Sequence, residues 1–216
     1  MRSYKIFSLI AVFFLSFGAV HAQDNAEETE TAAAFDPNDP ENHLVLDLST
    51  GGRVTIILYP HIAPKHVERI KKLTRQGFYN DVVFHRVIEG FMAQTGDPTG
   101  TGQGSSDLPN LEPEFTRNVH VRGTVSMARA SEENSANSQF FIVFQPTFSL
   151  DNTYSLFGRV KTGMNFVDAV QRGEPPSTPD KIIQASIGAD NVPPPSFAAP
   201  TESGLPEGEV AVSITD

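Results

Sequence analysis

The chain has 216 residues, of which 16 are glycine, 16 are proline and none is cysteine. The glycine and proline content favours a turn-rich fold over a helical bundle. The absence of cysteine excludes disulfides, thiol chemistry and cysteine zinc sites. The formal net charge of −10 argues against a nucleic-acid partner, because phosphate binding needs a basic surface.

The N-terminus is typical of a secretory signal peptide, which we assign to residues 1–22. Two basic residues within the first five precede an apolar run over residues 6–20, and small residues allow cleavage after Ala22. We therefore expect a periplasmic or secreted protein without stable membrane insertion. An uncleaved anchor is the alternative, although the apolar run is at the short end for a membrane-spanning helix.

Two polar segments flank the central part of the chain. Residues 23–42 are acidic, rich in Ala, Thr and Pro and without apolar periodicity, which predicts a disordered lead-in. Residues 191–216 include Pro193-Pro194-Pro195 and predict a flexible, proline-rich tail. Proline runs can dock onto partner domains, but we prefer a spacer here. The folded domain is therefore expected over residues 43–190.

Apolar periodicity in this domain predicts short strands and two helices. The first two strands, Leu44–Leu48 and Val54–Tyr59, flank a Ser-Thr-Gly-Gly hairpin signal. Lys65–Arg75 has helical spacing and ends before Gly77, and a second short helix is expected over Asn165–Gln171. The other predicted strands are Val82–Val87, Phe91–Thr95, Gly123–Arg129, Gln139–Phe144, Ser155–Val160 and Lys181–Ile187.

Many short strands with glycine turns predict an all-β barrel or sandwich, and the pattern alone does not separate the two. The segment Gly96–Ser106 is glycine-rich. It lacks the GxxxxGK(S/T) motif and the strand–loop–helix context of a phosphate-binding loop. A nucleotide site is therefore not expected.

The segment VFHRVIEGFMAQ (Val83–Gln94) places a charged side chain on an apolar face. Residues two apart in a strand share a face, so Arg86 is predicted between Phe84 and Ile88. An arginine whose stem packs while its head reaches solvent would be the ordinary explanation. The rest of the sequence favours a functional role instead.

The longer segment FHRVIEGFMAQTGDPTGTGQG resembles the signature of the cyclophilin-type peptidyl-prolyl isomerases. SMARA (Ser126–Ala130), NSQFFI (Asn137–Ile142) and LDNTYSLFGRV (Leu150–Val160) match the family in the same order. The resemblance covers roughly Leu44–Ile187. Within the family, the sequence is similar to the exported cyclophilins of bacteria. It implies a mainly β fold, a closed eight-stranded antiparallel barrel capped by two α-helices.

The chemistry of such an enzyme is rotation about an X–Pro peptide bond, against a barrier of about 18–20 kcal/mol. The barrier exists because the imide nitrogen donates its lone pair into the carbonyl. An enzyme needs a cationic donor near that nitrogen, a dry pocket for the ring and polar groups that hold the flanking backbone. Arg86 suits the first role, because a guanidinium remains charged and offers several donors.

The resemblance also implies the site residues. Arg86 matches the catalytic donor of the family, and Tyr154 replaces a histidine that lies over the proline ring. No metal or cofactor is expected, and the expected partners are proline-containing peptides and unfolded proteins, bound by a monomer. The substrate-binding residues implied by the resemblance are Phe91, Met92, Gln94, Gly102, Ala128, Arg129, Ala130, Gln139, Phe141, Leu150 and Tyr154.

The sequence departs from the family pattern in other places as well. Ser149 stands where many eukaryotic cyclophilins have a tryptophan that contacts cyclosporin, so weak inhibition by that drug is expected. Arg129 replaces a common asparagine, at a position where the backbone makes the substrate contact. Neither change removes the residues implied in catalysis.

Other polar residues are given structural interpretations. His85 is expected to be a hydrogen-bonded core histidine, and the other histidines lack metal-ligand spacing. Asp97, Glu112 and Glu114 are expected to be turn or solvent groups. Ser126 has no evident His/Asp partner in the sequence, which disfavours a hydrolase.

Together these patterns predict an exported prolyl cis-trans isomerase that assists the folding of exported proteins. The alternative is a proline-peptide-binding module or holdase chaperone with incidental turnover. The presence of Arg86 favours the enzyme, because a simple proline pocket does not need a cation.

Overall fold

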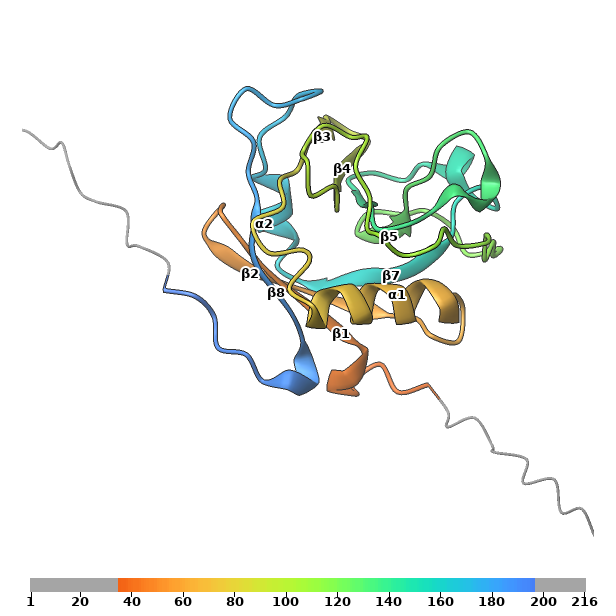
Figure 1. Ribbon diagram of the computed structural model, residues 1–216, viewed down its shortest axis with the longest axis horizontal. Helices are drawn as coiled ribbons and strands as arrows, with labels where there is room; N and C mark the ends of the chain where they lie inside the picture. Colours follow the sequence, from red (N-terminus) through yellow and green to blue (C-terminus); the bar gives the residue numbers. More distant parts are fainter. Residues whose placement is uncertain (1–34, 197–216) are drawn as a thin grey trace, which may run out of the picture. The chain divides into compact units, whose positions relative to one another are not determined.

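The computed structural model describes residues 35–196, so the predicted signal peptide, most of the lead-in and residues 197–216 lie outside the described residues. Within this range, eight strands form one sheet in the order β3-β4-β6-β5-β7-β2-β1-β8, with antiparallel pairing throughout (Figure 1). The strands are β1 (His43–Leu48), β2 (Gly52–Leu58), β3 (Arg86–Ile88), β4 (Met92–Thr95), β5 (Thr124–Met127), β6 (Phe140–Val143), β7 (Leu156–Thr162) and β8 (Ile182–Ile187). The α-helices are α1 (Pro64–Arg75) and α2 (Met164–Asp168).

The sheet curls into a half-barrel, and its ladder does not show a closed ring. β3 and β8 are the edge strands of the ladder. The segments next to them do meet, because Val83 and Lys181 form an isolated bridge and the Phe84 N–H donates to the Asp180 carbonyl at 2.8 Å. The predicted mainly β fold, with eight antiparallel strands and two α-helices, is therefore confirmed, while closure is not shown.

Helix α1 lies along one side of the curled sheet, near β7 and β8 (Figure 1). The apolar residues that gave this segment its helical spacing, Val67, Ile70 and Leu73, are all buried, which confirms the predicted helix. The N-terminus has no side-chain cap of its own. Glu114 takes this role from a distant loop, because its carboxylate accepts from the Lys65 N–H at 3.1 Å and from the next backbone N–H at 3.0 Å. Glu114 is thus a helix cap, which the sequence interpretation missed.

Several predicted strands and the second helix are shorter than expected; β5, for example, spans only Thr124–Met127. The second helix ends at Asp168 rather than at Gln171, although Val167 and Val170 are both buried. The strand predicted over Val82–Val87 is regular only in β3. Before β3 the chain pairs with the segment leading into β8 rather than with β4, and this change of partner interrupts the strand. In the described part of the chain, no helix has the length and apolarity needed to cross a membrane.

The interruption also changes which face Phe84 occupies. Phe84 and Val87 both pack in the main core, whereas Ile88 packs on a second, smaller cluster with Met92 and Phe141. The prediction that Phe84 shares a face with Arg86 is therefore wrong, because strict alternation holds only inside a regular strand.

Strand β6 divides its two aromatic residues between the two clusters. Phe140 is fully buried in the main core, and Phe141 lies in the smaller cluster together with Val143 and Leu150. Alternation along the strand places the two rings on opposite faces. The smaller cluster forms the floor of the site described next.

Candidate active site

A row of directly opposite residues crosses the sheet from its β3 edge. Arg86 on β3 pairs with Gln94 on β4, which pairs with Phe141 on β6, which pairs with Ser126 on β5. Directly opposite residues in antiparallel strands project to the same face. The register therefore brings a cation, an amide and an aromatic ring together on one surface.

Arg86, Gln94 and Phe141 line an apolar pocket of about 110 Å³. The Phe141 and Tyr154 rings meet edge to face, with their centroids 5.5 Å apart. Met92 is almost fully buried beneath the surface, so it contributes an apolar floor to the pocket. The residues lining this apolar pocket are Arg86, Phe91, Met92, Gln94, Ala128, Arg129, Phe141, Leu150 and Tyr154.

A larger polar pocket of about 480 Å³ adjoins the apolar one, and the two share Gln94, Ala128 and Arg129. We call the two pockets together the groove. All of the site residues predicted from the sequence line the groove, so the structure brings the whole set together without testing their individual roles. The residues lining the polar pocket are Gln94, Gly102, Gln103, Gly104, Ser105, Asn110, Ala128, Arg129, Ala130, Ser135, Asn137 and Gln139.

The two glutamines between the pockets are held by hydrogen bonds. Gln94 Nε2 donates to Gln139 Oε1 at 2.8 Å. Gln139 Nε2 in turn donates to the carbonyls of Gly102 at 3.1 Å and Gly104 at 2.8 Å. Both amides are therefore fixed in orientation before any ligand binds, which reduces the ordering cost of holding a peptide backbone.

The glycine-rich loop beside the polar pocket is organised by a buried carboxylate. Asp97 accepts from the Thr99 N–H at 2.7 Å, the Thr99 hydroxyl at 2.8 Å and the Gly102 N–H at 2.6 Å. Burial opposes its ionisation, but hydrogen bonds from Thr99, Gly104 and Gly102 outweigh burial and lower the pKa of Asp97 to about 2. Asp97 is thus a turn group, as predicted, and it is buried.

Arg86 is held by a carboxylate that the sequence interpretation did not single out. Its Nε donates to Glu174 Oε2 at 2.8 Å, and both side chains are partly exposed. Glu174 lies in the loop between α2 and β8, in a Gly-Glu-Pro-Pro stretch without a motif that would indicate a role. Its position becomes visible only from the pairing of Gly173 with Val87 in β3.

Comparison with known proteins identifies the family to which this chain belongs. The family model for cyclophilin type peptidyl-prolyl cis-trans isomerases matches residues 45–187. The chain belongs to this family. It is 46% identical over 192 residues to a probable peptidyl-prolyl cis-trans isomerase of Brucella suis biovar 1, covering 82% of this chain and 91% of the relative.

Solved cyclophilins have the same fold. Cyclophilin AquaCyp293 from Hirschia baltica superposes with a TM-score of 0.66 at 31% identity, over 72% of this chain and 77% of the other. A Cryptosporidium parvum cyclophilin, solved in the presence of the dipeptide Ala-Pro, has a TM-score of 0.63 at 28% identity, over 67% and 98% of the two chains. The chain is therefore a cyclophilin-type peptidyl-prolyl isomerase in sequence and in fold.

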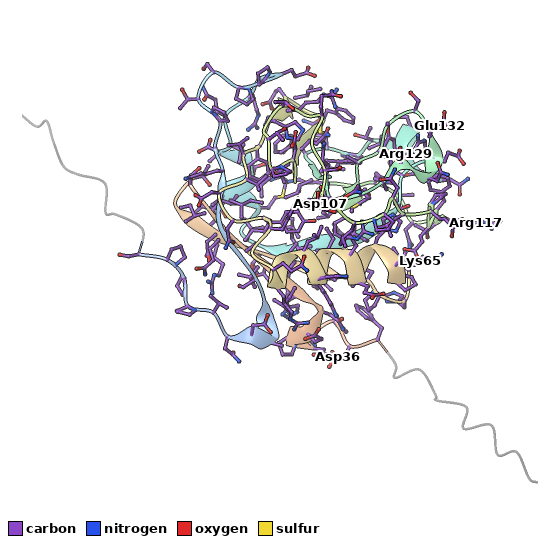
Figure 2. All side chains as sticks on the ribbon, in the orientation of Figure 1. Asp36, Lys65, Asp107, Arg117, Arg129 and Glu132 are labelled. Atoms are coloured by element: carbon purple, nitrogen blue, oxygen red, sulfur yellow. The ribbon has the colours of Figure 1, made fainter. Side chains whose placement is uncertain are left out.

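Arg129 and Tyr154 both depart from the family pattern, and their side chains lie against each other. Its guanidinium lies 5.0 Å from the centroid of the Tyr154 ring, and its Nε donates to the Thr153 carbonyl at 3.2 Å. Nη1 donates to the Ala130 carbonyl at 3.0 Å. Figure 2 shows Arg129 in the same surface region as Glu132. The Arg129 side chain therefore stabilises the position of Tyr154 and of the neighbouring loop backbone in this cyclophilin's groove.

His85 is buried, as predicted, but neither of its ring nitrogens has a hydrogen-bond partner among the described residues. The prediction of a hydrogen-bonded histidine is therefore wrong. Its ring lies under the glycine-rich loop, 3.4 Å from where a Cβ on Gly102 would stand. Burial, and to a smaller extent the charge of Arg86, lower the pKa of His85, while Asp97 opposes this. The imidazole is accordingly neutral at physiological pH and supplies no charge to the cyclophilin site.

Ser126 does have a histidine and an aspartate partner, contrary to the sequence interpretation. His120 Nε2 lies 2.8 Å from Ser126 Oγ, and His120 Nδ1 lies 2.8 Å from Asp151 Oδ1. Spacing along the sequence gave no indication of this, because the loop carrying Asp151 folds back onto the segment before β5. Ser126 and His120 are fully buried and line neither pocket. A substrate cannot reach the hydroxyl, so the arrangement serves packing in this cyclophilin.

Within residues 35–196, no three His, Asp or Glu side chains gather in a way that could hold a metal ion. The polar groups of the groove are amides, hydroxyls, backbone groups and two guanidiniums. These groups can donate hydrogen bonds to a bound peptide and place positive charge beside it.

Proposed function

We propose that this cyclophilin isomerises X–Pro bonds in unfolded exported proteins, with Arg86 as the donor to the prolyl nitrogen. The observation that supports the proposal most directly is the position of Arg86 at the rim of the apolar pocket, opposite Gln94 in the sheet. The proline ring occupies the apolar pocket. The peptide backbone extends across the polar pocket, along Gln94, Gln139 and Ala128–Ala130.

Catalysis follows from withdrawing the prolyl nitrogen's lone pair from amide resonance. A hydrogen bond from Arg86 to that nitrogen favours its pyramidal form, in which the C–N bond rotates more easily. One charge-assisted hydrogen bond contributes about 1.5–3 kcal/mol, which is roughly ten- to a hundredfold in rate. The fixed amides of Gln94 and Gln139 add a preorganised environment that does not need to reorient during rotation. Arg129 contacts the peptide through its backbone, since its side chain is occupied by Tyr154 and the loop carbonyls.

Proline-containing substrates are supported by the Cryptosporidium parvum cyclophilin, which was solved in the presence of Ala-Pro. Export is supported by the pattern of residues 1–22, and the mass of the intact exported protein tests it. A chain beginning at Gln23 is the expected result, and a mass that retains the apolar run would indicate an anchored protein. We also infer a monomer, and a barrel that closes through the segments around the Val83–Lys181 bridge.

The direct test is a protease-coupled isomerisation assay on an X-Pro peptide, comparing the wild type with Arg86→Ala. Arg159→Ala is the matched control, because Arg159 is an exposed arginine on β7 away from the groove. Loss of turnover in Arg86→Ala alone, with an unchanged circular dichroism spectrum, is expected. Equal activity in Arg86→Ala and the wild type would remove Arg86 from the mechanism. No activity in a folded wild type that still binds proline peptides would favour the binding-module or holdase alternative.

A further inference from the structure

Glu174 lies beside Arg86 because two strand-like segments are paired. Val87 and Gly173 exchange both backbone hydrogen bonds, each 2.8 Å long, in an antiparallel bridge. In an antiparallel pair, the residue before one partner faces the residue after the other. The register therefore sets Glu174 opposite Arg86, as one more member of the row that continues through Gln94 and Phe141.

The loop that carries Glu174 is fixed by its own hydrogen bonds. The Gln171 N–H donates to Asp180 Oδ2 at 2.9 Å, and the Gln171 side chain bonds Ser177 at 3.1 Å and the Thr178 N–H at 3.0 Å. In Figure 1 this blue loop lies beside β3. Because these hydrogen bonds link the two ends of the loop, the Glu174 carboxylate has a fixed position beside β3.

The carboxylate engages Arg86 at one particular nitrogen. Nε donates to Glu174 Oε2 at 2.8 Å, and within residues 35–196 this is the hydrogen bond that Arg86 makes. A guanidinium carries one N–H on Nε and four on the two Nη atoms. The pairing therefore leaves the four Nη donors available while Arg86 lines the apolar pocket.

We propose that Glu174 is a positioning residue for catalysis: it clamps Arg86 through Nε so that the Nη groups are presented to the prolyl nitrogen. This inference rests on the proposed role of Arg86. A long, half-exposed arginine otherwise samples several rotamers, and a donor must be held close to its productive geometry to act. The carboxylate also keeps positive charge at the rim of the apolar pocket without entering it, since Glu174 lines neither pocket.

A competing interpretation is that Glu174 is inhibitory, a brake on turnover, because its carboxylate must move away from Arg86 before substrate binds. The geometry disfavours this interpretation, because the carboxylate occupies Nε rather than the Nη groups. The two interpretations predict opposite changes in rate when the carboxylate is removed. A clamp predicts slower turnover, and a brake predicts faster turnover.

The test compares Glu174→Ala and Glu174→Gln with the wild type, on an X-Pro peptide with separate determination of kcat and KM. Both partners are exposed, at 40% and 52% of their side-chain surfaces. The expected effect is therefore modest, about a two- to fivefold fall in kcat with little change in KM. Glu174→Gln retains an acceptor oxygen and should fall between the wild type and Glu174→Ala. Added salt should lower the wild-type rate toward that of Glu174→Ala, because salt screens exposed ion pairs.

The matched control is Glu112→Gln, because Glu112 pairs with Lys65 at the same distance of 2.8 Å and lines neither pocket. It should leave kcat unchanged. In NMR spectra, the Arg86 Nε–H signal should be slow to exchange in the wild type and broadened in Glu174→Ala. A structural role elsewhere in the protein would not move this signal.

A double-mutant cycle separates this inference from the proposed function. In the Arg86→Ala background, Glu174→Ala should have no further effect on kcat, because there is no guanidinium to clamp. If Arg86→Ala abolishes turnover but Glu174→Ala alone leaves kcat unchanged or raises it, the clamp is wrong and the proposed function stands. If Arg86→Ala retains full turnover, both are wrong.

Discussion

Two sets of polar residues lie on either side of Phe141, and they differ in solvent access as well as in chemical type. On one side, Arg86 and its partner Glu174 stand partly exposed at the rim of the apolar pocket. On the other, Ser126 and His120 are fully buried and form a hydrogen-bonded chain with the partly exposed Asp151, in the residue order of a serine hydrolase triad. The groups that a substrate can reach in the groove are two guanidiniums, several amides, hydroxyls and backbone groups. Access therefore decides which of the two sets can act on a peptide.

The largest effect is expected at Phe141, which separates the two sets. Its ring is almost fully buried, and it faces the apolar pocket while stacking on His120 at 6.5 Å between centroids. Phe141→Ala should lower the free energy of unfolding by about 3–5 kcal/mol, because a large core cavity remains. Urea denaturation measures this. Phe148→Ala is the matched control, because that ring is 62% exposed and its loss should cost less than about 0.5 kcal/mol.

Lowering the pH should reduce the free energy of unfolding, because Asp97 in the loop beside the groove becomes protonated. Its pKa is lowered from the ordinary value of 3.8 to about 2 in the folded protein, so the stabilisation is fully present above about pH 4. It is lost as pH falls from about 4 toward 2, and it amounts to about 2 kcal/mol. Asp97→Asn should remove that part of the acid dependence, measured by urea denaturation at several pH values. Asp107→Asn, at an exposed aspartate of the same loop region (Figure 2), should retain it. An unchanged acid dependence in Asp97→Asn would contradict the assignment.

The inaccessibility of the Ser126 hydroxyl is tested with a serine-directed fluorophosphonate. Ser126 should not be labelled in the folded protein, because its hydroxyl is fully buried. Ser126→Ala should cost about 1–3 kcal/mol in the free energy of unfolding, since it leaves a buried His120 nitrogen without a partner. Ser105→Ala, at an exposed serine, is the control for stability. Stoichiometric labelling of Ser126 would show that this hydroxyl is accessible after all and would break the comparison.

The smallest effect is expected at Arg129. Its guanidinium bonds loop carbonyls and lies over Tyr154, so the substrate contact at this position comes from the backbone. Arg129→Ala should therefore change kcat/KM by less than about fivefold, which corresponds to about 1 kcal/mol. A loss as large as that of Arg86→Ala would show that the groove depends on both cations.

The sequence predicted the elements and the groove because both depend on local patterns. The spacing of Val67, Ile70 and Leu73 identified α1, and the family motifs identified residues that the structure gathers around two adjoining pockets. These motifs are short segments whose residues lie on neighbouring strands. Matching them required no knowledge of how distant loops pack.

What the sequence did not predict depends on contacts between distant segments. Glu174 meets Arg86 across 88 positions, and Asp151 meets His120 across 31. Neither carboxylate lies in a motif that points to its partner. The position of Phe84 was missed for a related reason, because its strand changes pairing partner just before β3. Alternation cannot reveal such a change.

The central claim is that Arg86 acts on the rotating bond rather than on binding alone. It is tested most directly by measuring the affinity and the cis–trans exchange rate of one X-Pro peptide by NMR, in the wild type and in Arg86→Ala. The exchange rate of the bound peptide should fall roughly ten- to a hundredfold, while Kd changes by less than about threefold. Loss of affinity in proportion to loss of exchange would contradict the claim and leave the groove as a recognition surface for proline.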